Sequence, residues 1–364
     1  MKAGLTFQVL TTLSEIESSQ TAWESLYAKS KHATIFTSFA WVTTWASVYQ
    51  HTIEKLFIVT VNKAGVLVGV IPLYVRKVDT TTAWFISSGE PSQSETCSER
   101  QDLLGDESIL ASALDSLRDL MIEFGIKRLS LNNVSPSALI TSWCSSSNIR
   151  YLTSKRGRRF YIPSECGRSK LEKKVRRGRR AAKNLNAKYI HVKSRDELQT
   201  AFASLKALNA KRWKEKGHPA IFDDLLFSQF HQEILNKLLD EQRLSLVMLE
   251  VEDQIIAVNY SIISGQDLIF YQNGIDTHFK PNISPGLLLH YEQLLLAKES
   301  GLSAYDFMMS TNADSYKRSI TERSEAVLSL CIYSHSLPFL CSKMKRYLTM
   351  IIKRSMKGVV DDKI

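Results

Sequence analysis

The part of the chain best suited to chemistry is a strand, a loop and a helix within residues 268–317. The strand pattern ends at Asn273-Gly274, and Ser284-Pro285-Gly286 opens the helix that follows the loop. Ser284 can cap this helix, Pro285 suits its first turn, and Gly286 lets a ligand approach the backbone. The first turn carries no acidic residue, so its free N–H groups and the helix dipole favour a phosphate or pyrophosphate.

Ser-Pro-Gly also begins many helices that bind no ligand, so the surrounding elements must decide between the two interpretations. The corresponding helix of the first half begins with Asp106 and Glu107, whose carboxylates would repel a phosphate. If only one half of the chain binds such a group, we expect it to be the second half.

The elements that position this segment occur twice. In each half, two helices precede a hairpin (residues 56–75 and 244–263), a strand, a helix that ends near a glycine, and a further strand. Capping boxes begin the first helix of each half, at Ser14 with Glu17 and at Ser194 with Glu197. This order indicates an internal duplication; the alternative is the ordinary alternation of many α/β proteins.

Residues 155–188 hold 14 Lys or Arg against two Glu, and we place the boundary between the halves at the start of this segment. One expected helix carries five bases within two turns: Arg176, Arg177, Arg179, Arg180 and Lys183. Such a helix can attract a polyanion through its phosphates, tRNA included. Because it lacks the aromatic residues of a base-stacking platform, we expect electrostatic attraction rather than reading of a base sequence.

The whole chain has 364 residues, a net charge of +10 and a pI of about 9.2, which favours anionic partners. Its length suffices for two domains. Five scattered cysteines without CxxC spacing favour a reducing compartment and argue against a metal site. No apolar run approaches the roughly 20 residues of a membrane span, and the first residues lack the apolar core of a signal peptide. We therefore expect a cytoplasmic protein.

Residues 336–364 predict an amphipathic helix with one apolar face and many bases. The apolar face holds Leu340, Met344, Leu348 and Ile351 or Ile352. The bases are Lys343, Lys345, Arg346, Lys353, Arg354 and Lys357. One interpretation is a packing helix with a solvated basic face. The other is that residues 340–357, together with residues 168–188, contact a polyanion or the inner membrane surface.

Motifs that are weak one by one occur in a specific order along the chain. The first half has W-E-S-L-Y, F-T-S-F-A-W-V-T-T-W and G-V-L-V-G-V-I-P-L, and the middle has K-K-V-R-R-G-R-R-A-A-K-N-L and Lys211-Arg212-Trp213. The second half has I-I-A-V-N-Y, F-Y-Q-N-G-I-D, I-S-P-G-L-L-L, Y-D-F-M and S-Y-K-R. Together they resemble the GNAT-like acyltransferases of the cellulose-biosynthesis (CelD-type) family, relatives of the Fem-type aminoacyltransferases.

The resemblance implies an α/β fold with a mixed sheet and two tandem GNAT-like domains. These would be a degenerate half over residues 1–155 and an acyltransferase half over residues 156–335, followed by the basic helix over residues 336–364. The second half would bind acetyl-CoA or another acyl-CoA between two splayed strands, with the pyrophosphate on the next helix. The implied cofactor-binding residues are Tyr271, Gln272, Asn273, Ser284, Pro285, Gly286 and Lys317. The glycine-rich pyrophosphate loop of ordinary GNAT enzymes is absent, and KPNISPG stands in its place.

Acyl transfer needs a proton for the leaving thiolate and a route for the proton of the attacking amine or hydroxyl. The resemblance makes Tyr316, which follows the last core strand, a candidate acid; the alternative is a packed tyrosine. Asp306 could orient the acceptor or be a structural carboxylate. His278 could act as a base near neutral pH or simply be an exposed loop histidine.

Arg212 and Trp213 end a helix that should lie near the site, and Asp276 flanks the cofactor loop. A tryptophan beside bases can bind a sugar or nucleotide. A core tryptophan with an arginine at the favourable end of the helix dipole explains the same pattern.

Three functional hypotheses follow. The first is an acyl-CoA-dependent N- or O-acyltransferase, acetyltransferase above all, acting on a sugar, nucleotide-sugar or polysaccharide precursor in envelope or exopolysaccharide biosynthesis. The second is a Fem-type aminoacyl-tRNA-dependent transferase, in which tRNA would be the one nucleic-acid partner. The third is a non-enzymatic basic binding protein on a GNAT fold, because fold does not fix function.

Overall fold

The computed structural model describes residues 4–167, 169–280, 282–312 and 315–361; the side chains of residues 107–113, 115 and 350–361 are outside this description. The expectations for the side chains of Glu107, Ile351, Ile352, Lys353, Arg354 and Lys357 therefore lie outside the described residues.

The first half alternates helices and strands as its hydrophobic periodicity predicts. Its strands are β1 (Leu5–Leu10), β2 (Ile53–Lys63), β3 (Val66–Arg76), β4 (Asp79–Phe85), β5 (Leu104–Gly105), β6 (Arg128–Val134) and β7 (Arg150–Pro163). Its helices are α1 (Leu13–Ser18), α2 (Gln20–Lys29), α3 (Phe39–Val48), α4 (Glu107–Glu123) and α5 (Leu139–Ser146), with short 3₁₀ turns at Ile35–Thr37 and Gln50–Thr52.

The second half repeats this order. Its strands are β8 (Lys188–His191), β9 (Leu244–Val251), β10 (Gln254–Ser264), β11 (Asp267–Ile275), β12 (Ala304–Ser310) and β13 (Ser324–Tyr333). Its helices are α6 (Lys170–Asn184), α7 (Arg195–Glu215), α8 (Leu225–Asp240), α9 (Pro285–Glu299), α10 (Lys317–Ile320) and α11 (Ser336–Asp361), with a 3₁₀ turn at Ile221–Asp223. The repeated order of hairpin, strand, helix and strand is thus confirmed. Two helices, α7 and α8, precede the second hairpin as expected, whereas the first helix expected in the first half is divided into α1 and α2.

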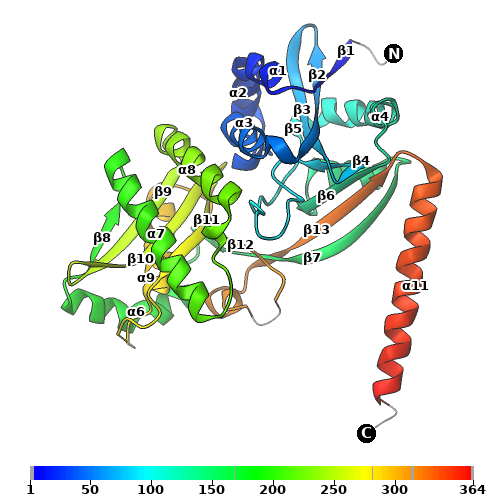
Figure 1. Cartoon of the computed structure of the whole chain (residues 1–364). Coiled ribbons are helices and arrows are strands. Elements are labelled where there is room, and N and C mark those ends of the chain that lie inside the picture. Colours follow the sequence, from blue (N-terminus) through cyan, green and yellow to red (C-terminus); the bar gives the residue numbers. More distant parts are fainter. Residues whose placement is uncertain (1–3, 168, 281, 313–314, 362–364) are drawn as a thin grey trace.

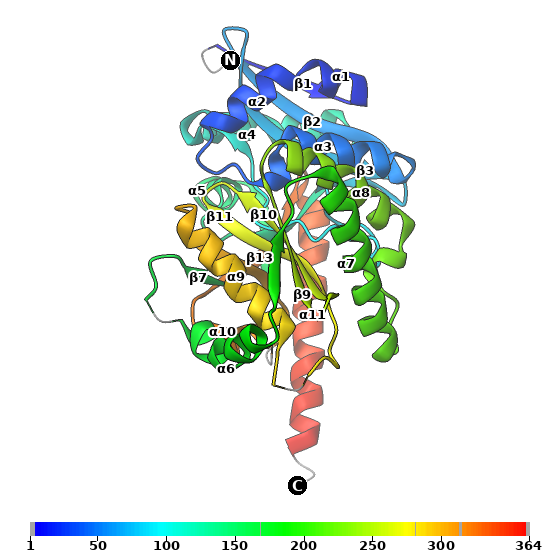
Figure 2. The same ribbon diagram turned by 90° about the vertical axis from the view of Figure 1, so that its left-hand side faces the viewer.

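One continuous mixed sheet joins the two halves (Figures 1 and 2). The strand order is β1-β2-β3-β4-β6-β13-β7-β12-β11-β10-β9-β8, and β5 pairs with β3 off this path. The pairs β4–β6 and β11–β12 are parallel, one in each half, and the other pairs are antiparallel. Each parallel pair is linked by a long helix, α4 or α9, as a parallel connection requires. The expected α/β fold with a mixed sheet is confirmed.

The halves exchange their last strands. β7 ends the first half but pairs with β12 of the second, whereas β13 ends the second half but pairs with β6 of the first. β7 and β13 also pair with each other along their length, and Figure 1 shows both as long strands that run between the two lobes. The boundary expected between residues 155 and 156 falls inside β7, and neither strand was recognised from the sequence.

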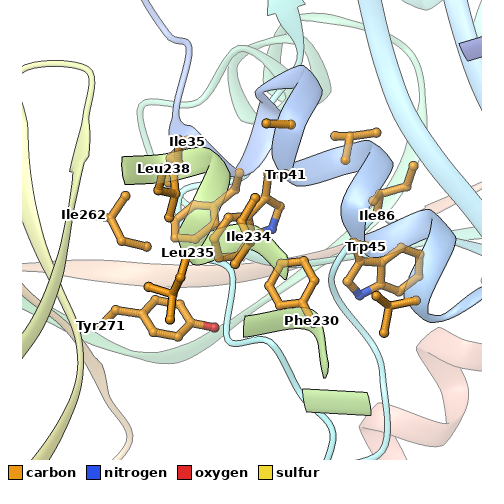
Figure 3. Packing of buried hydrophobic residues seen from close by; sticks show 14 of the residues in the cluster. Ile35, Trp41, Trp45, Ile86, Phe230, Ile234, Leu235, Leu238, Ile262 and Tyr271 are labelled. Carbon is orange, nitrogen blue, oxygen red and sulfur yellow. The ribbon is translucent and has the colours of Figure 1, made fainter. Parts of the chain in front are cut away.

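A buried core lies between the two halves (Figure 3). Trp41 of α3 packs against Phe230 of α8 and Tyr271 of β11, with ring centres 4.9 and 5.9 Å away. Trp45 of α3 belongs to the same buried cluster. Two further cores lie under α4 and α5 in the first half and under α6 and α9 in the second. Burial of large aromatic side chains between the halves stabilises their mutual arrangement.

One capping box differs from its prediction. Thr12, not Ser14, caps α1: its hydroxyl accepts a hydrogen bond from the Glu15 N–H, and the Glu15 carboxylate bonds the Thr12 N–H. The two overlapping boxes share the same spacing, and the extended backbone at Thr12 decides between them. The box of Ser194 with Glu197 at α7 is confirmed.

Candidate functional site

The site begins where two parallel strands separate. β11 and β12 pair only between residues 267–269 and 304–306. Beyond this point β11 continues along β10, while β12 follows β7 through an irregularity between Asp306 and Met309. The two strands therefore diverge and leave backbone edges that face a gap.

A cavity of about 530 Å³ opens along β11, beyond the residues that pair with β12. Much of its wall is apolar and comes from β11 and the following loop, with Phe270, Phe279 and Ile283 among the lining residues. The structure brings nine of the predicted site residues to this cavity: Arg212, Tyr271, Gln272, Asn273, Ser284, Pro285, Gly286, Tyr316 and Lys317. They come from α7, β11, the start of α9 and the start of α10, so the tertiary fold alone makes them neighbours.

The amino end of α9 is uncapped and lies in the cavity wall. Ser284 is its N-cap residue but makes no side-chain capping bond, and the first turn has no acidic residue. The N–H of Leu288 bonds the Ser284 carbonyl, while Pro285 has no N–H, so Gly286 and Leu287 carry free donors in the described structure. A Cβ on Gly286 would press on Ile275. The backbone here is open to an anion.

The basic helix α6 packs against this helix start. Its apolar stripe of Leu171, Val175, Gly178 and Ala182 is buried. A Cβ placed on Gly178 would lie 3.9 Å from the Ser284 nitrogen, so the chain of α6 passes close to the free donors. The opposite side of α6 is exposed and basic.

Most of these bases have no acidic partner. Lys170 pairs with Glu322, and Arg179 stacks on the ring of Tyr291 at 4.6 Å. Within the described residues, six others form no ion pair: Lys173, Lys174, Arg176, Arg177, Arg180 and Lys183. Their uncompensated charge raises the local concentration of anions around the cavity.

A buried hydrogen-bond chain leads to Tyr316, although the sequence did not single out its central residue, His290. The Tyr305 hydroxyl lies 2.9 Å from His290 Nδ1, and the Tyr316 hydroxyl lies 3.3 Å from His290 Nε2. Asn259 directs its amide nitrogen at His290 Nδ1, because its amide oxygen accepts from the Ser261 hydroxyl. Nδ1 is therefore an acceptor, and Nε2 carries the hydrogen that points to Tyr316.

The electrostatics of the hydrogen-bond chain keep His290 and Tyr316 neutral. Burial, helped by the charge of Lys317, lowers the pKa of His290 to about 3. Tyr316 has 46% of its surface exposed, but its hydroxyl is withdrawn from water; this raises its pKa to about 12, against the opposing charge of Arg212. Since His290 Nε2 donates to the Tyr316 oxygen, the Tyr316 O–H is left to donate into the cavity.

Arg212 and Lys317 supply positive charge to the cavity. Arg212 donates from Nη1 to Asn273 Oδ1 at 3.2 Å, which ties α7 to the end of β11. Lys317 donates to the carbonyls of Met308 and Met309 at 3.2 and 2.8 Å. Its ammonium group therefore holds α10 to β12. Burial lowers the pKa of Lys317, against the opposing effect of nearby carboxylates.

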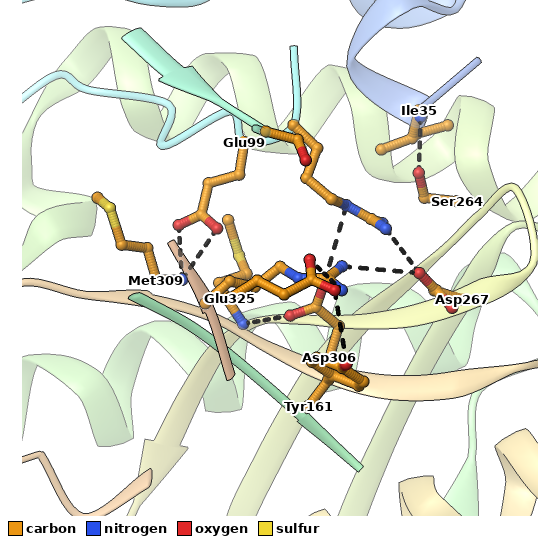
Figure 4. A network of polar contacts seen from close by, with 12 residues as sticks. Ile35, Glu99, Tyr161, Ser264, Asp267, Asp306, Met309 and Glu325 are labelled. Atoms are coloured by element: carbon orange, nitrogen blue, oxygen red, sulfur yellow. Dashed lines mark hydrogen bonds and ion pairs between the residues drawn. The ribbon is translucent and has the colours of Figure 1, made fainter. Parts of the chain in front are cut away.

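Asp306, a candidate catalytic residue in the sequence, does not line the cavity. It is 1% exposed and accepts hydrogen bonds from Arg159 Nη1 at 2.9 Å and from the Met308 N–H at 2.8 Å. Arg100 Nε lies 3.8 Å away. These contacts make Asp306 the centre of an ion network between the halves (Figure 4).

The first half fixes the diverging strands through its loop over residues 86–103. Both carboxylate oxygens of Glu99 accept from the Met309 N–H, at 2.8 and 2.9 Å, and Arg100 pairs with Asp267 at 2.6 Å (Figure 4). The Tyr271 hydroxyl bonds the Thr96 carbonyl. Burial raises the pKa of Glu99 to about 7. The sequence signal was a polar run, S-E-T-C-S-E-R-Q-D, which sequence analysis left unassigned.

Three other predicted residues also lie outside the cavity lining. Asp276 pairs with Lys211 at 3.0 Å and accepts from the His278 N–H. The His278 side chain is 71% exposed and lies 3.4 Å from Glu215. Trp213 faces a separate cavity of about 510 Å³, which also involves residues 219–226. Among the described residues, no group of three or more His, Cys, Asp or Glu side chains could hold a metal ion.

Comparison with known proteins supports a GNAT domain. Residues 169–318 match the model of the family described as Acetyltransferase (GNAT) domain. No curated protein sequence matches the chain at a significant level. The segment that matches the GNAT model, residues 169–318, covers the helices and strands that surround the cavity.

Solved structures share the fold over most of the chain at low sequence identity. FemX aligns over 92% of this chain and 98% of its own, with a TM-score of 0.60 and 13% identity. L-PGS from Bacillus licheniformis aligns over 90% and 96%, with a TM-score of 0.56 and 11% identity. A conserved protein of unknown function from Bacteroides thetaiotaomicron aligns over 90% and 99%, with a TM-score of 0.55 and 12% identity. The chain thus shares the fold of these structures over most of its length, and its residues 169–318 match a GNAT domain.

Proposed function

We propose that the protein is an acyl-CoA-dependent N- or O-acyltransferase whose donor, acetyl-CoA first of all, binds in the cavity along β11, where this strand diverges from β12. The observation that carries the proposal is the cavity itself. It combines the edge of β11, the uncapped amino end of α9 and the side chain of Tyr316 within about 530 Å³. The free donors at Gly286 and Leu287 would receive the pyrophosphate, and the edge of β11 from Tyr271 to Asn273 would receive the pantetheine amides.

In this proposal Tyr316 is the acid of the reaction. The acceptor nitrogen or oxygen forms its bond to the acyl carbon as the bond from that carbon to sulfur breaks. Tyr316 gives its proton to the leaving sulfur, and the acceptor releases its own proton to water. His290, which donates to the Tyr316 oxygen, stabilises the phenolate that remains until a proton returns.

For the acceptor, we propose a sugar, nucleotide-sugar or polysaccharide precursor, as in envelope or exopolysaccharide biosynthesis. The support is the CelD-type resemblance and the neighbouring cavity at Trp213, where an aromatic ring stands close to Asp223 and Asp224. An aromatic face with nearby carboxylates suits a ring that carries hydroxyl groups. Arg212, the residue before Trp213, lies at the donor cavity, so the two cavities adjoin along α7.

An aminoacyl-tRNA-dependent transfer, as in the Fem-type enzymes that the sequence resembles, is the second candidate. The observation that favours it is α6, whose six unpaired bases lie on the exposed side of a helix that packs against the start of α9. FemX has the same fold. A tRNA would contact many of these bases at once, so its binding would weaken steeply with salt.

The test is thermal stabilisation by acetyl-CoA, longer acyl-CoAs and tRNA, with two matched variants. Ser284→Asp places a carboxylate at the start of α9, where an acidic N-cap preserves the helix but repels a phosphate. Ser194→Asp makes the same change at the N-cap of α7, whose first turn lies outside the cavity lining.

A ligand at about 100 times its dissociation constant stabilises the fold by about 2.7 kcal/mol. We expect wild type and Ser194→Asp to gain this from acyl-CoA and Ser284→Asp to lose it. If no acyl-CoA stabilises wild type, the proposal is wrong. Salt-sensitive stabilisation by tRNA in that case favours the second candidate, and the absence of both favours a binding protein without this chemistry.

A further inference from the structure

The C-terminal helix α11 stands apart from the rest of the molecule, on the outer side of β7 and β13 (Figure 1). Its described side chains touch the body in few places. Arg346 Nη1 donates to the Thr153 carbonyl of β7 at 2.9 Å, and the Phe339 ring meets the Tyr333 ring of β13 with 5.8 Å between centres. These two contacts define the face of α11 that looks toward the protein.

The opposite face of α11 is apolar and exposed. Its large side chains are between 52% and 71% exposed: Leu337, Leu340, Met344, Tyr347 and Leu348. At about 100° per residue these five positions fall within roughly 100° of the helix circumference. Arg346 lies on the far side of that circle, so the apolar stripe points away from the body. A stripe of this size on an isolated helix marks a contact surface.

The charge of α11 is positive over nearly its whole length. From Ser336 to Val360 the chain contains six Lys or Arg and no Asp or Glu. On the helical wheel, Lys343 borders the apolar stripe on one side and Lys345 borders it on the other. Neither lysine has an ion-pair partner in the part of the chain that the structure describes.

We propose that the apolar stripe of α11 binds the surface of an anionic phospholipid bilayer, with the helix axis parallel to the membrane. The five apolar side chains would enter the boundary between headgroups and acyl chains, and Lys343 and Lys345 would reach the phosphates on either side. None of the described helices is long and apolar enough to cross a membrane.

Charge argues for a lipid surface over a second copy of the chain. Two α11 helices packed stripe to stripe would bring their flanking lysines together, and neither helix has acidic residues between Ser336 and Val360 to pair with them. An anionic bilayer supplies the missing negative charge, and each base near such a surface adds to binding.

The experiment is sedimentation of the full chain with vesicles of phosphatidylcholine alone or with phosphatidylglycerol. The test variant is Leu340→Gln, Met344→Gln and Leu348→Gln combined. The control, Val66→Gln with Val78→Gln, removes apolar side chains that are 63% and 83% exposed elsewhere. All these positions are exposed, so both variants should keep the wild-type melting temperature.

We expect wild type and control to bind the anionic vesicles. The triple variant should bind them at least about tenfold more weakly than wild type. The double variant Lys343→Gln, Lys345→Gln should lose the preference for phosphatidylglycerol, and its vesicle binding should depend less on salt concentration than that of wild type. Equal binding by triple variant and control overturns the proposal, as does no binding by wild type. A dimer in light scattering that the triple variant abolishes, without vesicle binding, assigns the stripe to a second copy. Acyl-CoA stabilisation should be the same in all variants, which separates this proposal from the proposed function.

Discussion

Replacing Arg159 with Met should weaken the junction between the halves. Arg159 lies on β7, the exchanged strand, and pairs with Asp306 at 2.9 Å and with Glu325 of β13 at 3.3 Å. Methionine keeps most of the length of the side chain and removes its charge. The Asp306 carboxylate, 1% exposed, then lacks its main partner.

Loss of one partner of a buried ion pair costs about 3–5 kcal/mol, because the other charge stays buried without compensation. Here the Met308 N–H at 2.8 Å and Arg100 Nε at 3.8 Å still face the Asp306 carboxylate. We therefore expect the lower end of that range, about 3 kcal/mol. Asp306→Asn with Arg159→Met should recover part of the loss, since the buried charge is then gone too.

Urea unfolding followed by tryptophan fluorescence measures this loss. Arg195→Met is the matched control, because Arg195 pairs with Asp240 at 2.8 Å while both side chains are more than half exposed. That surface pair should cost at most about 1 kcal/mol. If Arg159→Met and Arg195→Met cost the same, the buried network does not hold the halves together and the reasoning is refuted.

Other predictions concern acid stability, packing and the reaction. Burial lowers the pKa of His231 to about 3 from 6.5, so protons favour the unfolded chain as pH falls below 6.5. Between pH 7 and pH 5 the free energy of unfolding of His231→Phe, measured in urea, should therefore fall by about 2 kcal/mol less than that of wild type. Gly274→Ala should destabilise by about 1–3 kcal/mol, since a Cβ there would lie 2.6 Å from the Leu205 carbonyl oxygen; unchanged urea midpoints would contradict this. Tyr316→Phe should keep acyl-CoA stabilisation but slow thiol release in the presence of an acceptor by about 10²–10⁴. An equal rate would exclude Tyr316 as the acid.

Local signals account for the parts of the fold that the sequence predicted. The Ser194 and Glu197 box, the two hairpins and the Ser284-Pro285 helix start each depend on a few neighbouring residues, so their patterns are readable in one dimension. The choice between Thr12 and Ser14 as the first cap could not be made from the sequence, because both positions meet the same spacing rule and only the backbone conformation separates them.

Residues distant in sequence explain what was missed. β7 reads as a basic segment, since the buried Arg159 finds its acids on β12 and β13, about 150 residues away. His290 looks like a core residue of α9, and only the approach of Tyr305 and Tyr316 makes it part of a hydrogen-bond chain. Asp306, by contrast, looked available for chemistry until the structure paired it with Arg159.

The sequence by itself determined the repeated order of elements, the helix start at Ser284 with no acid in its first turn, and the excess of bases on α6 and α11, because these are properties of periodicity and composition. That Ser284 makes no capping bond was decided by the structure. The tertiary structure decided which strands exchange, which side chains meet in the cavity and which face of α11 is left bare. Those depend on contacts between segments far apart in the chain, whose partners no local pattern specifies.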